Sequence, residues 1–219
     1  MPKYTIVPIV EGFGEVEAVP ILIRRWLTFR RFPNFDIDIR GPVRASGKGS
    51  LTVQYVEYGD LGVEHFVDLA LRANPNAILV LLDADKDCPA TLGQSLLARA
   101  KANLPPGFPI GVVVANREFE AWFLAAFGSP RFRQGLASAN FTLQRHSIPR
   151  GFDVESIAGC KARIAEWVGI DQYEPTLHQP MLTKHLPFSP SMLRRSRSFR
   201  KLLDELERLT AAARTRRDR

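Results

Sequence analysis

Cysteine and histidine are scarce in this sequence of 219 residues. The two cysteines, Cys88 and Cys160, lie far apart and lack metal-ligand spacing, and the four histidines show no spacing typical of a shared metal site. These absences exclude a disulfide scaffold and a zinc ribbon, and they favour a reducing compartment. The sequence therefore predicts a cytoplasmic protein without a Cys- or His-rich metal centre.

Long apolar runs and targeting signals are absent as well. No run approaches the ~18 consecutive apolar residues that a membrane span requires. Residues 1–4 lead directly into a strand-like segment, so neither a signal peptide nor a transit peptide is expected. We therefore expect no membrane partner.

Positive charge is unevenly distributed along the chain. The formal net charge is +7, and residues 194–219 hold ten Lys and Arg against four Asp and Glu. The rest of the chain is therefore nearly neutral. A basic end of this kind is either a solvated helix end or a contact region for nucleic acid or another anionic surface.

Strand and helix patterns alternate in the first half of the chain. A short strand is predicted at 4–10, buried strands at 77–82 and 110–115, and two half-exposed strands at 36–40 and 51–57, joined by a glycine loop at 47–50. Helical periodicity follows the strands at 4–10, 77–82 and 110–115 and also covers 61–72. This alternation predicts an α/β fold with a mainly parallel, Rossmann-like sheet and helices on both faces.

The second half of the sequence has a different character. Residues 128–160 are rich in loop formers, and helices are predicted near 161–168 and 190–213, the latter with Ser189 as N-cap and Pro190 at its first position. We therefore expect an α/β domain at 1–127 and a loop-rich, helical extension with a basic tail at 128–219.

Carboxylates follow three of the predicted strands, those at 4–10, 77–82 and 110–115. Glu11 ends the first, Asp83 and Asp85 end the second, and Glu118 and Glu120 lie just beyond the third. The carboxyl ends of parallel strands form the site in such sheets, and crowded carboxylates repel unless a cation neutralises them. Oxygen ligands favour Mg²⁺ or Mn²⁺. Taken singly, each acid could instead be a turn, a helix cap or a partner of a helix dipole.

The motifs Glu11-Gly12-Phe13-Gly14-Glu15 and Leu82-Asp83-Ala84-Asp85 resemble the Toprim domain of topoisomerases, bacterial primases and OLD-family endonucleases. The segment at 117–123 is similar to the third acidic motif of the OLD-type branch, and still closer to small stand-alone Toprim-like bacterial proteins described beside ATPase partners. The resemblance covers about residues 4–127. It implies a Toprim-like fold and a metal-dependent site.

The resemblance also implies roles for individual residues. Glu11 matches a metal ligand that in some members is also a general acid or base, Asp83 and Asp85 match metal ligands, and Glu15 matches an added ligand or a residue supporting one. Glu118 and Glu120 would point ~200° apart on a helix, so one of them reaches the metal, and the resemblance selects Glu120.

The resemblance leaves the roles of two further residues undecided. Asp87 is an extra acid that either ligates or caps the next helix. Lys184 is a candidate for the lysine that OLD-type enzymes take from their helical part, and otherwise an exposed loop lysine.

These residues predict a Mg²⁺-dependent endonuclease or phosphodiesterase that acts on DNA or RNA. Gly47-Lys48-Gly49-Ser50 is not a Walker loop, so any ATPase would be a separate chain. The alternatives are a non-catalytic Toprim-like subunit that binds nucleic acid or an ATPase, and a haloacid-dehalogenase-type phosphatase using Asp83 and Asp85. The oligomeric state stays open, a homodimer among the options.

Overall fold

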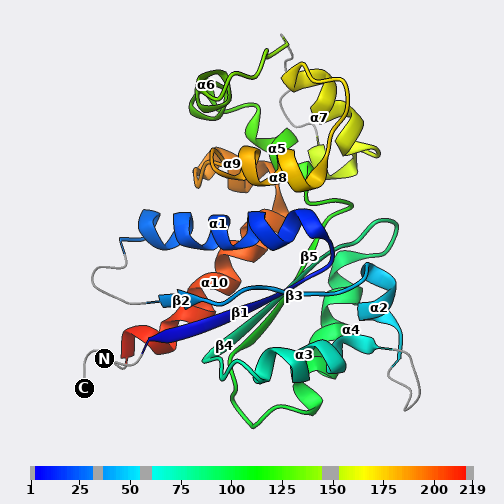
Figure 1. Ribbon diagram of the computed structural model, residues 1–219, viewed down its shortest axis with the longest axis vertical. Helices are drawn as coiled ribbons and strands as arrows, with labels where there is room; N and C mark the ends of the chain where they lie inside the picture. Colours follow the sequence, from blue (N-terminus) through cyan, green and yellow to red (C-terminus); the bar gives the residue numbers. More distant parts are fainter. Residues whose placement is uncertain (1–2, 32–36, 55–60, 145–152, 216–219) are drawn as a thin grey trace.

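A parallel sheet forms the centre of the protein. The computed structural model describes residues 3–31, 37–54, 61–144 and 153–215, and within them the chain forms a five-stranded sheet of order β2-β1-β4-β5, with β3 also pairing with β1 (Figure 1). All pairings are parallel, as predicted. The strands are β1 (Tyr4–Val10), β2 (Ile37–Ile39), β3 (Val43–Arg44), β4 (Ala77–Asp83) and β5 (Ile110–Ala115).

Pro8 lies in the middle of β1 without breaking the sheet. Ile6 and Val10 direct their carbonyls toward the β2 and β3 side, where they accept from Arg40 and Ala45. Pro8 shares that orientation and falls in the gap between the two short strands, since β2 pairs with residues 4–6 and β3 with residues 9–10. The missing N–H of the proline therefore costs no ladder hydrogen bond.

Both faces of the sheet are buried, so alternate residues of each strand enter different cores. Ile6, Leu79 and Val113 pack with α1 (Phe13–Phe29) and α10 (Arg197–Thr215). Val7 and Val80 pack with α3 (Gly62–Leu71) and α4 (Pro89–Ala102). The continuous apolar runs of β1, β4 and β5 are those expected for strands covered on both sides. The α/β, Rossmann-like fold predicted from the sequence is therefore confirmed.

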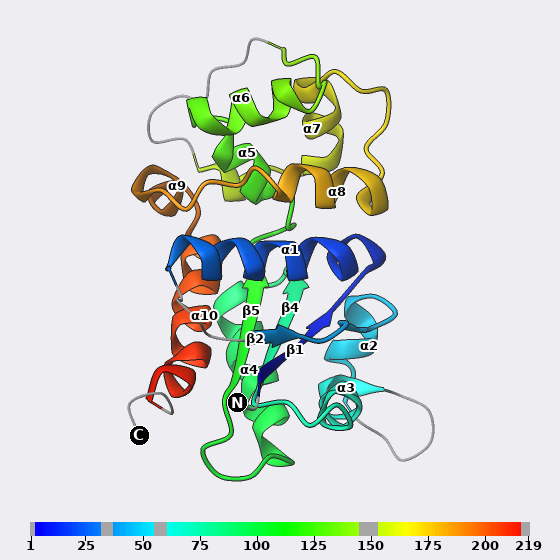
Figure 2. The ribbon, with the colours of Figure 1, turned by 60° about the vertical axis from the view of Figure 1, so that its left-hand side comes forward.

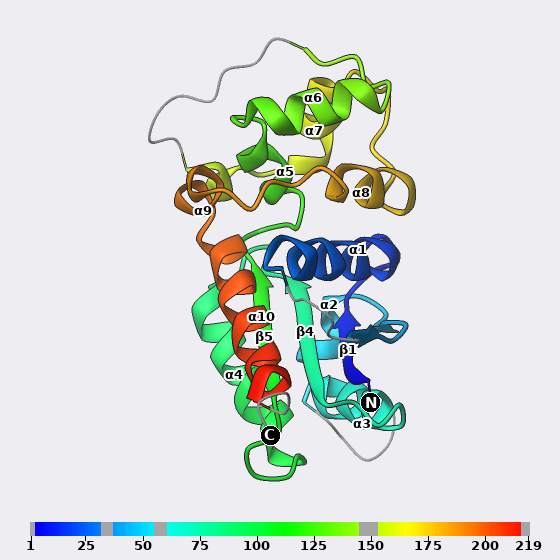
Figure 3. The same ribbon diagram turned by 90° about the vertical axis from the view of Figure 1, so that its left-hand side faces the viewer.

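A helical layer lies beyond the carboxyl ends of the strands. Figures 2 and 3 show β4 and β5 pointing toward α1 and the helices beyond it. This layer contains α5 (Ala121–Ala126), α6 (Pro130–Ser138), the 3₁₀ turn η1 (Val154–Ser156), α7 (Cys160–Val168), α8 (Pro175–Thr183) and α9 (Pro190–Arg195). Helix α8 packs along α1, and α10 returns to the sheet against β5. The division at residue 127 stays a prediction.

The predicted strand at 51–57 is wrong in its described part. Residues Lys48–Thr52 form the short helix α2 instead, and 55–57 lie outside the described residues. Gly47 has a φ of 90° and turns the chain, and Leu51 is fully buried in the core on the α3 side. Tertiary burial of this leucine outweighs the short alternation of polar and apolar residues.

The region after residue 127 contains more helices than predicted. Helix α6 occupies part of the region expected to be loop, α8 was not predicted, and the helix expected at 190–213 is two helices that meet at Ser196. Ser196 and Ser198 donate their hydroxyls to buried Glu155, at 2.7 and 2.5 Å, and this contact holds the extended break between α9 and α10. The cap by Ser189 is confirmed, since its side chain accepts from Met192 N.

None of the helices in the described ranges is both long and apolar enough to cross a bilayer.

Candidate functional site

Glu11 and Asp83 meet where the neighbouring strands β1 and β4 end. The Glu11 carboxylate accepts a hydrogen bond from the backbone N–H of Asp83 at 3.0 Å. Asp83 in turn accepts from the backbone N–H of Phe119 at 2.8 Å, which joins the segment after β5 to the other two. Two carboxylates thus connect three strand ends, as the strand-end pattern in the sequence predicted.

Glu118 and Glu120 lie in the turn that precedes α5, and not inside a helix. Arg117 has a φ of 61°, and the helix begins only at Ala121. The expected ~200° separation of the two glutamates therefore does not apply. Both contact the ammonium group of Lys161 on α7, at 2.8 Å for Glu118 and 3.3 Å for Glu120.

Glu120 is the more deeply buried of the two, with a side chain only 1% exposed. Its Oε2 atom is the one that lies 3.3 Å from the Lys161 ammonium, and within the described residues it accepts no hydrogen bond. A buried carboxylate requires a cation close to it, and Lys161 is the cation that contacts Glu120 in this structure.

The carboxylates raise one another's pKa. Burial raises the pKa of Asp83 well above its ordinary value, and Glu120 and Glu11 raise it further. Burial also raises the pKa of Glu120, although Lys161 opposes this. The pKa of Glu11 is raised by burial, against the hydrogen bond from the Asp83 backbone. The three acids therefore share a region of negative potential that favours a cation.

Lys161 neutralises part of this charge. Burial alone would lower its pKa, but Glu120 and Glu118 outweigh burial and raise it, so the ammonium stays charged. The neighbouring Cys160 thiol has its pKa raised to about 12 by burial and by the same two glutamates. Cys160 is therefore a buried neutral thiol and not a nucleophile.

Glu15 supports the start of α1. One carboxylate oxygen accepts from the backbone N–H of Gly12 at 3.0 Å, and the other accepts from the Gln179 amide of α8 at 3.0 Å. The first contact is half of a capping box. Glu15 therefore ties α1 to α8 beside the site, and both of its oxygens are already engaged.

Asp85 and Asp87 both form an ion pair with Lys48. Lys48 of α2 lies 2.9 Å from each carboxylate and donates to the carbonyl of Ala84 at 2.8 Å. Both aspartates are more than half exposed, and Asp85 has a φ of 53°. The loop after β4 is thereby fixed to α2, and Asp85 lies close enough to Glu11 to contribute to the raised pKa of Glu11.

Lys184 does not join the acidic group. It is exposed at the end of α8, and together with Arg25, Arg131 and His185 it lines a cavity of about 300 Å³. The lysine that contacts the acids is Lys161, which sequence reasoning missed because nothing near Glu118 or Glu120 in the chain indicates it. Gln179 and Lys48 were missed for the same reason.

The donor set fits a hard divalent cation in its chemistry. Glu11, Asp83 and Glu120 offer carboxylate oxygens only, with raised pKa values and one buried oxygen without a hydrogen bond. In the portion of the chain that the structure describes, no three acidic, histidine or cysteine side chains lie as close as ligands of one ion would. The cation that these residues do place beside Glu118 and Glu120 is the ammonium of Lys161.

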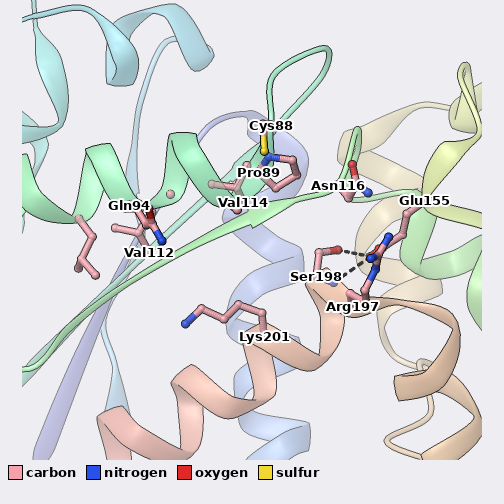
Figure 4. Close-up of a pocket in the computed structure, with 13 residues that line it drawn as sticks. Cys88, Pro89, Gln94, Val112, Val114, Asn116, Glu155, Arg197, Ser198 and Lys201 are labelled. Atoms are coloured by element: carbon pink, nitrogen blue, oxygen red, sulfur yellow. Dashed lines mark hydrogen bonds between the residues drawn. The ribbon is translucent and has the colours of Figure 1, made fainter.

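A further cavity, of about 530 Å³, lies beside the edge strand β5 between α4 and α10 (Figure 4). Val112 and Val114 line it, and Asn116 faces it from the end of β5. Its one lining carboxylate, Glu155, is held by Ser198. None of the carboxylates at the strand ends lines this cavity.

The fold and the site define an α/β protein with a carboxylate group at the carboxyl end of a parallel sheet. No family model matches the sequence, and no curated protein matches it. Among solved structures, the C-terminal region of the Burkholderia pseudomallei OLD protein is similar at a TM-score of 0.42 and 16% identity, covering 94% of this chain and 98% of that one. Similarity at this level assigns no activity, so the functional argument depends on the site.

Proposed function

We propose that this protein is a metal-dependent phosphodiesterase of Toprim type that hydrolyses nucleic acid. One observation carries the proposal: Glu11, Asp83 and Glu120 come from three separate strand ends, and burial together with Glu120 and Glu11 raises the pKa of Asp83. Such a concentration of carboxylates costs folding free energy and is typical of a cation site.

Glu11, Asp83 and Glu120 would hold the ion, which we propose to be Mg²⁺ or Mn²⁺. When bound, such an ion stabilises negative charge on phosphoryl oxygens and lowers the pKa of a bound water. Asp83 is already oriented by its hydrogen bond from Phe119, and Glu11 by its bond from Asp83, so both would bind with little loss of side-chain entropy.

Other residues would complete the chemistry. Glu11 has a raised pKa and lies at the open end of β1, which suits a group that accepts and returns a proton. The charge of Lys161 would stabilise a phosphate group next to Glu118 and Glu120. Lys48 would hold the loop that carries Asp85 and Asp87.

The test is cleavage of labelled DNA and RNA by wild type, Asp83→Asn and Asp68→Asn, each with Mg²⁺, Mn²⁺ or EDTA. Asp68 is an exposed acid of α3 and serves as the matched control. We expect cleavage with metal by wild type and Asp68→Asn, and a loss of at least ~100-fold for Asp83→Asn. Equal cleavage by Asp83→Asn and wild type would refute the proposal.

A second candidate is a non-catalytic subunit that binds nucleic acid or a separate ATPase. Its supporting observation is that Lys48 and Lys161 already neutralise four of the carboxylates in this region. Binding of DNA or RNA without cleavage under every metal condition would favour it over the nuclease.

A further inference from the structure

Basic side chains gather at the far end of the paired helices α1 and α8. Arg25 comes from α1, Arg131 from α6, and Lys184 and His185 follow α8. These four residues, called the basic cluster below, line a cavity of about 300 Å³, and three of them also line a neighbouring cavity of about 550 Å³. Figure 2 shows α8 between α1 and α6.

Among the residues that the structure describes, no acidic side chain pairs with the basic cluster. Neither cavity is lined by an Asp or Glu, and within the described ranges Arg131 and Lys184 form no ion pair. Burial and the nearby Arg131 lower the pKa of Arg25, and burial, Arg25 and Lys184 lower the pKa of His185. Unbalanced repulsion of this kind is relieved by a bound anion.

Arg25 is held rigidly for such a role. It donates to the carbonyls of Thr183 and Leu186, at 2.9 and 2.8 Å, and lies over the ring of Phe188. One guanidinium nitrogen makes both bonds, which leaves N–H donors on the other nitrogens. A fixed arginine beside the exposed charges of Arg131 and Lys184 is suited to phosphate oxygens.

We infer that the basic cluster binds phosphate groups of a nucleic-acid backbone, at a distance from the acidic site. The choice of nucleic acid rests on the proposed function. Glu15, beside the acidic site, and Arg25 are ten residues apart on α1, a rise of about 15 Å. That length corresponds to ~4 nucleotides at the axial spacing of phosphates in one strand. Lys184 is thereby assigned to substrate binding, away from the chemical step.

The test is the binding of a labelled DNA duplex in EDTA across a range of salt concentrations. The variant Arg131→Ala/Lys184→Ala removes two exposed charges, and Arg72→Ala/Lys101→Ala removes two exposed charges from α3 and α4 as the control. We expect the first variant to lose about tenfold in affinity and to lower the slope of log K against log salt by ~2, with the control close to wild type.

Unchanged affinity and slope in the first variant would overturn the inference, and so would an equal loss in the control. Thermal melts with inorganic phosphate separate the two sources of the anion. If the first variant loses stabilisation by phosphate yet binds DNA like wild type, the cluster takes free phosphate and the backbone assignment is wrong. Because binding is measured without metal, a failure of the proposed cleavage activity would not affect this result.

Discussion

At the scale of single residues, burial and neighbouring acids raise the pKa values of Glu11, Asp83 and Glu120. The pKa of Asp83 lies well above its ordinary value, because burial and three neighbouring glutamates all raise it. A carboxyl group whose pKa is raised in the folded state keeps its proton up to a higher pH than it does in the unfolded chain. The free energy of unfolding therefore falls as pH rises from the ordinary pKa of Asp toward the folded value, and the full penalty applies above it.

Asp83→Asn should remove this penalty while keeping an oxygen to accept from Phe119 N. In EDTA at pH 8 we expect the variant to melt at or above the temperature of wild type, with the difference vanishing near pH 4. Mg²⁺ should raise the Tm of wild type and raise that of the variant much less, since ligands stabilise by RT ln(1 + [L]/Kd). Thermal melts between pH 4 and 8 measure both effects. A variant that melts clearly lower in EDTA and keeps the full Mg²⁺ shift would show that Asp83 is only structural.

Lys161→Met should destabilise the protein, because it leaves buried Glu120 without a cation. Lys161 is itself 43% exposed, so we expect a cost of about 1–2 kcal/mol at pH 8, below that of a fully buried pair. The cost should shrink at pH 5, where Glu120 can take up a proton. Urea unfolding at the two pH values measures it. Arg40→Met, which breaks an exposed pair with Asp38, should cost ~0.5 kcal/mol or less at both, and an equal cost in the two variants would contradict the argument.

At the scale of elements, the close contact of α1 with α8 fixes the site. Gly14 lies in the first turn of α1, and a Cβ there would fall 1.9 Å from Gln179 Oε1 and 3.0 Å from Pro175 Cβ. Gln179 is fully buried and also holds Glu15, so it has no free space into which to move. A glycine is thus required where the two helices meet.

Gly14→Ala should therefore cost ~1–3 kcal/mol through overpacking. Gly49→Ala is the matched control, because no atom lies within 4 Å of its added Cβ and alanine favours the helix α2. Denaturant unfolding should show a lower midpoint for the first variant and an unchanged or higher midpoint for the second. Equal midpoints for wild type and Gly14→Ala would mean that α8 shifts without cost.

At the scale of the whole molecule, charge separates into an acidic site at the strand ends and basic regions around it. The basic tail predicted from the sequence reaches residues 216–219, which lie outside the described residues. The described part of α10 packs on β5, and Tyr4 of β1 donates to the Leu209 carbonyl at 2.6 Å. The last helix is therefore part of the core, whatever its end contributes.

Deletion of residues 214–219 removes four arginines and one aspartate. We expect weaker nucleic-acid binding and a flatter salt dependence, because phosphate contacts release counterions. Stabilisation by Mg²⁺ should stay unchanged, since the strand ends are untouched. Replacing the same arginines by glutamine gives a control of equal length. Unchanged affinity and salt slope in both variants would mean that the tail is a solvated helix end that does not contact nucleic acid.

The sequence by itself determined the sheet and the position of the acids along it. Continuous apolar runs predicted β1, β4 and β5, because strands covered on both faces need no polar alternation. Parallel pairing then required that Glu11 and Asp83 meet at one edge, and the structure joins them at 3.0 Å. These features depend on local periodicity and on the rule that parallel strands end at the same edge of a sheet, whereas the pairing of β1 with β4 comes from the structure.

Only the tertiary structure decided which charges meet those acids. Lys161 reaches Glu118 from 43 residues away, and Lys48 reaches Asp85 across 37 residues, with no local pattern to indicate either contact. The same holds for α2, where burial of Leu51 replaced an expected strand by a helix. Long-range packing selects such partners because the burial of a charge or of an apolar side chain is worth more than local propensity, and its energy depends on residues distant in the sequence.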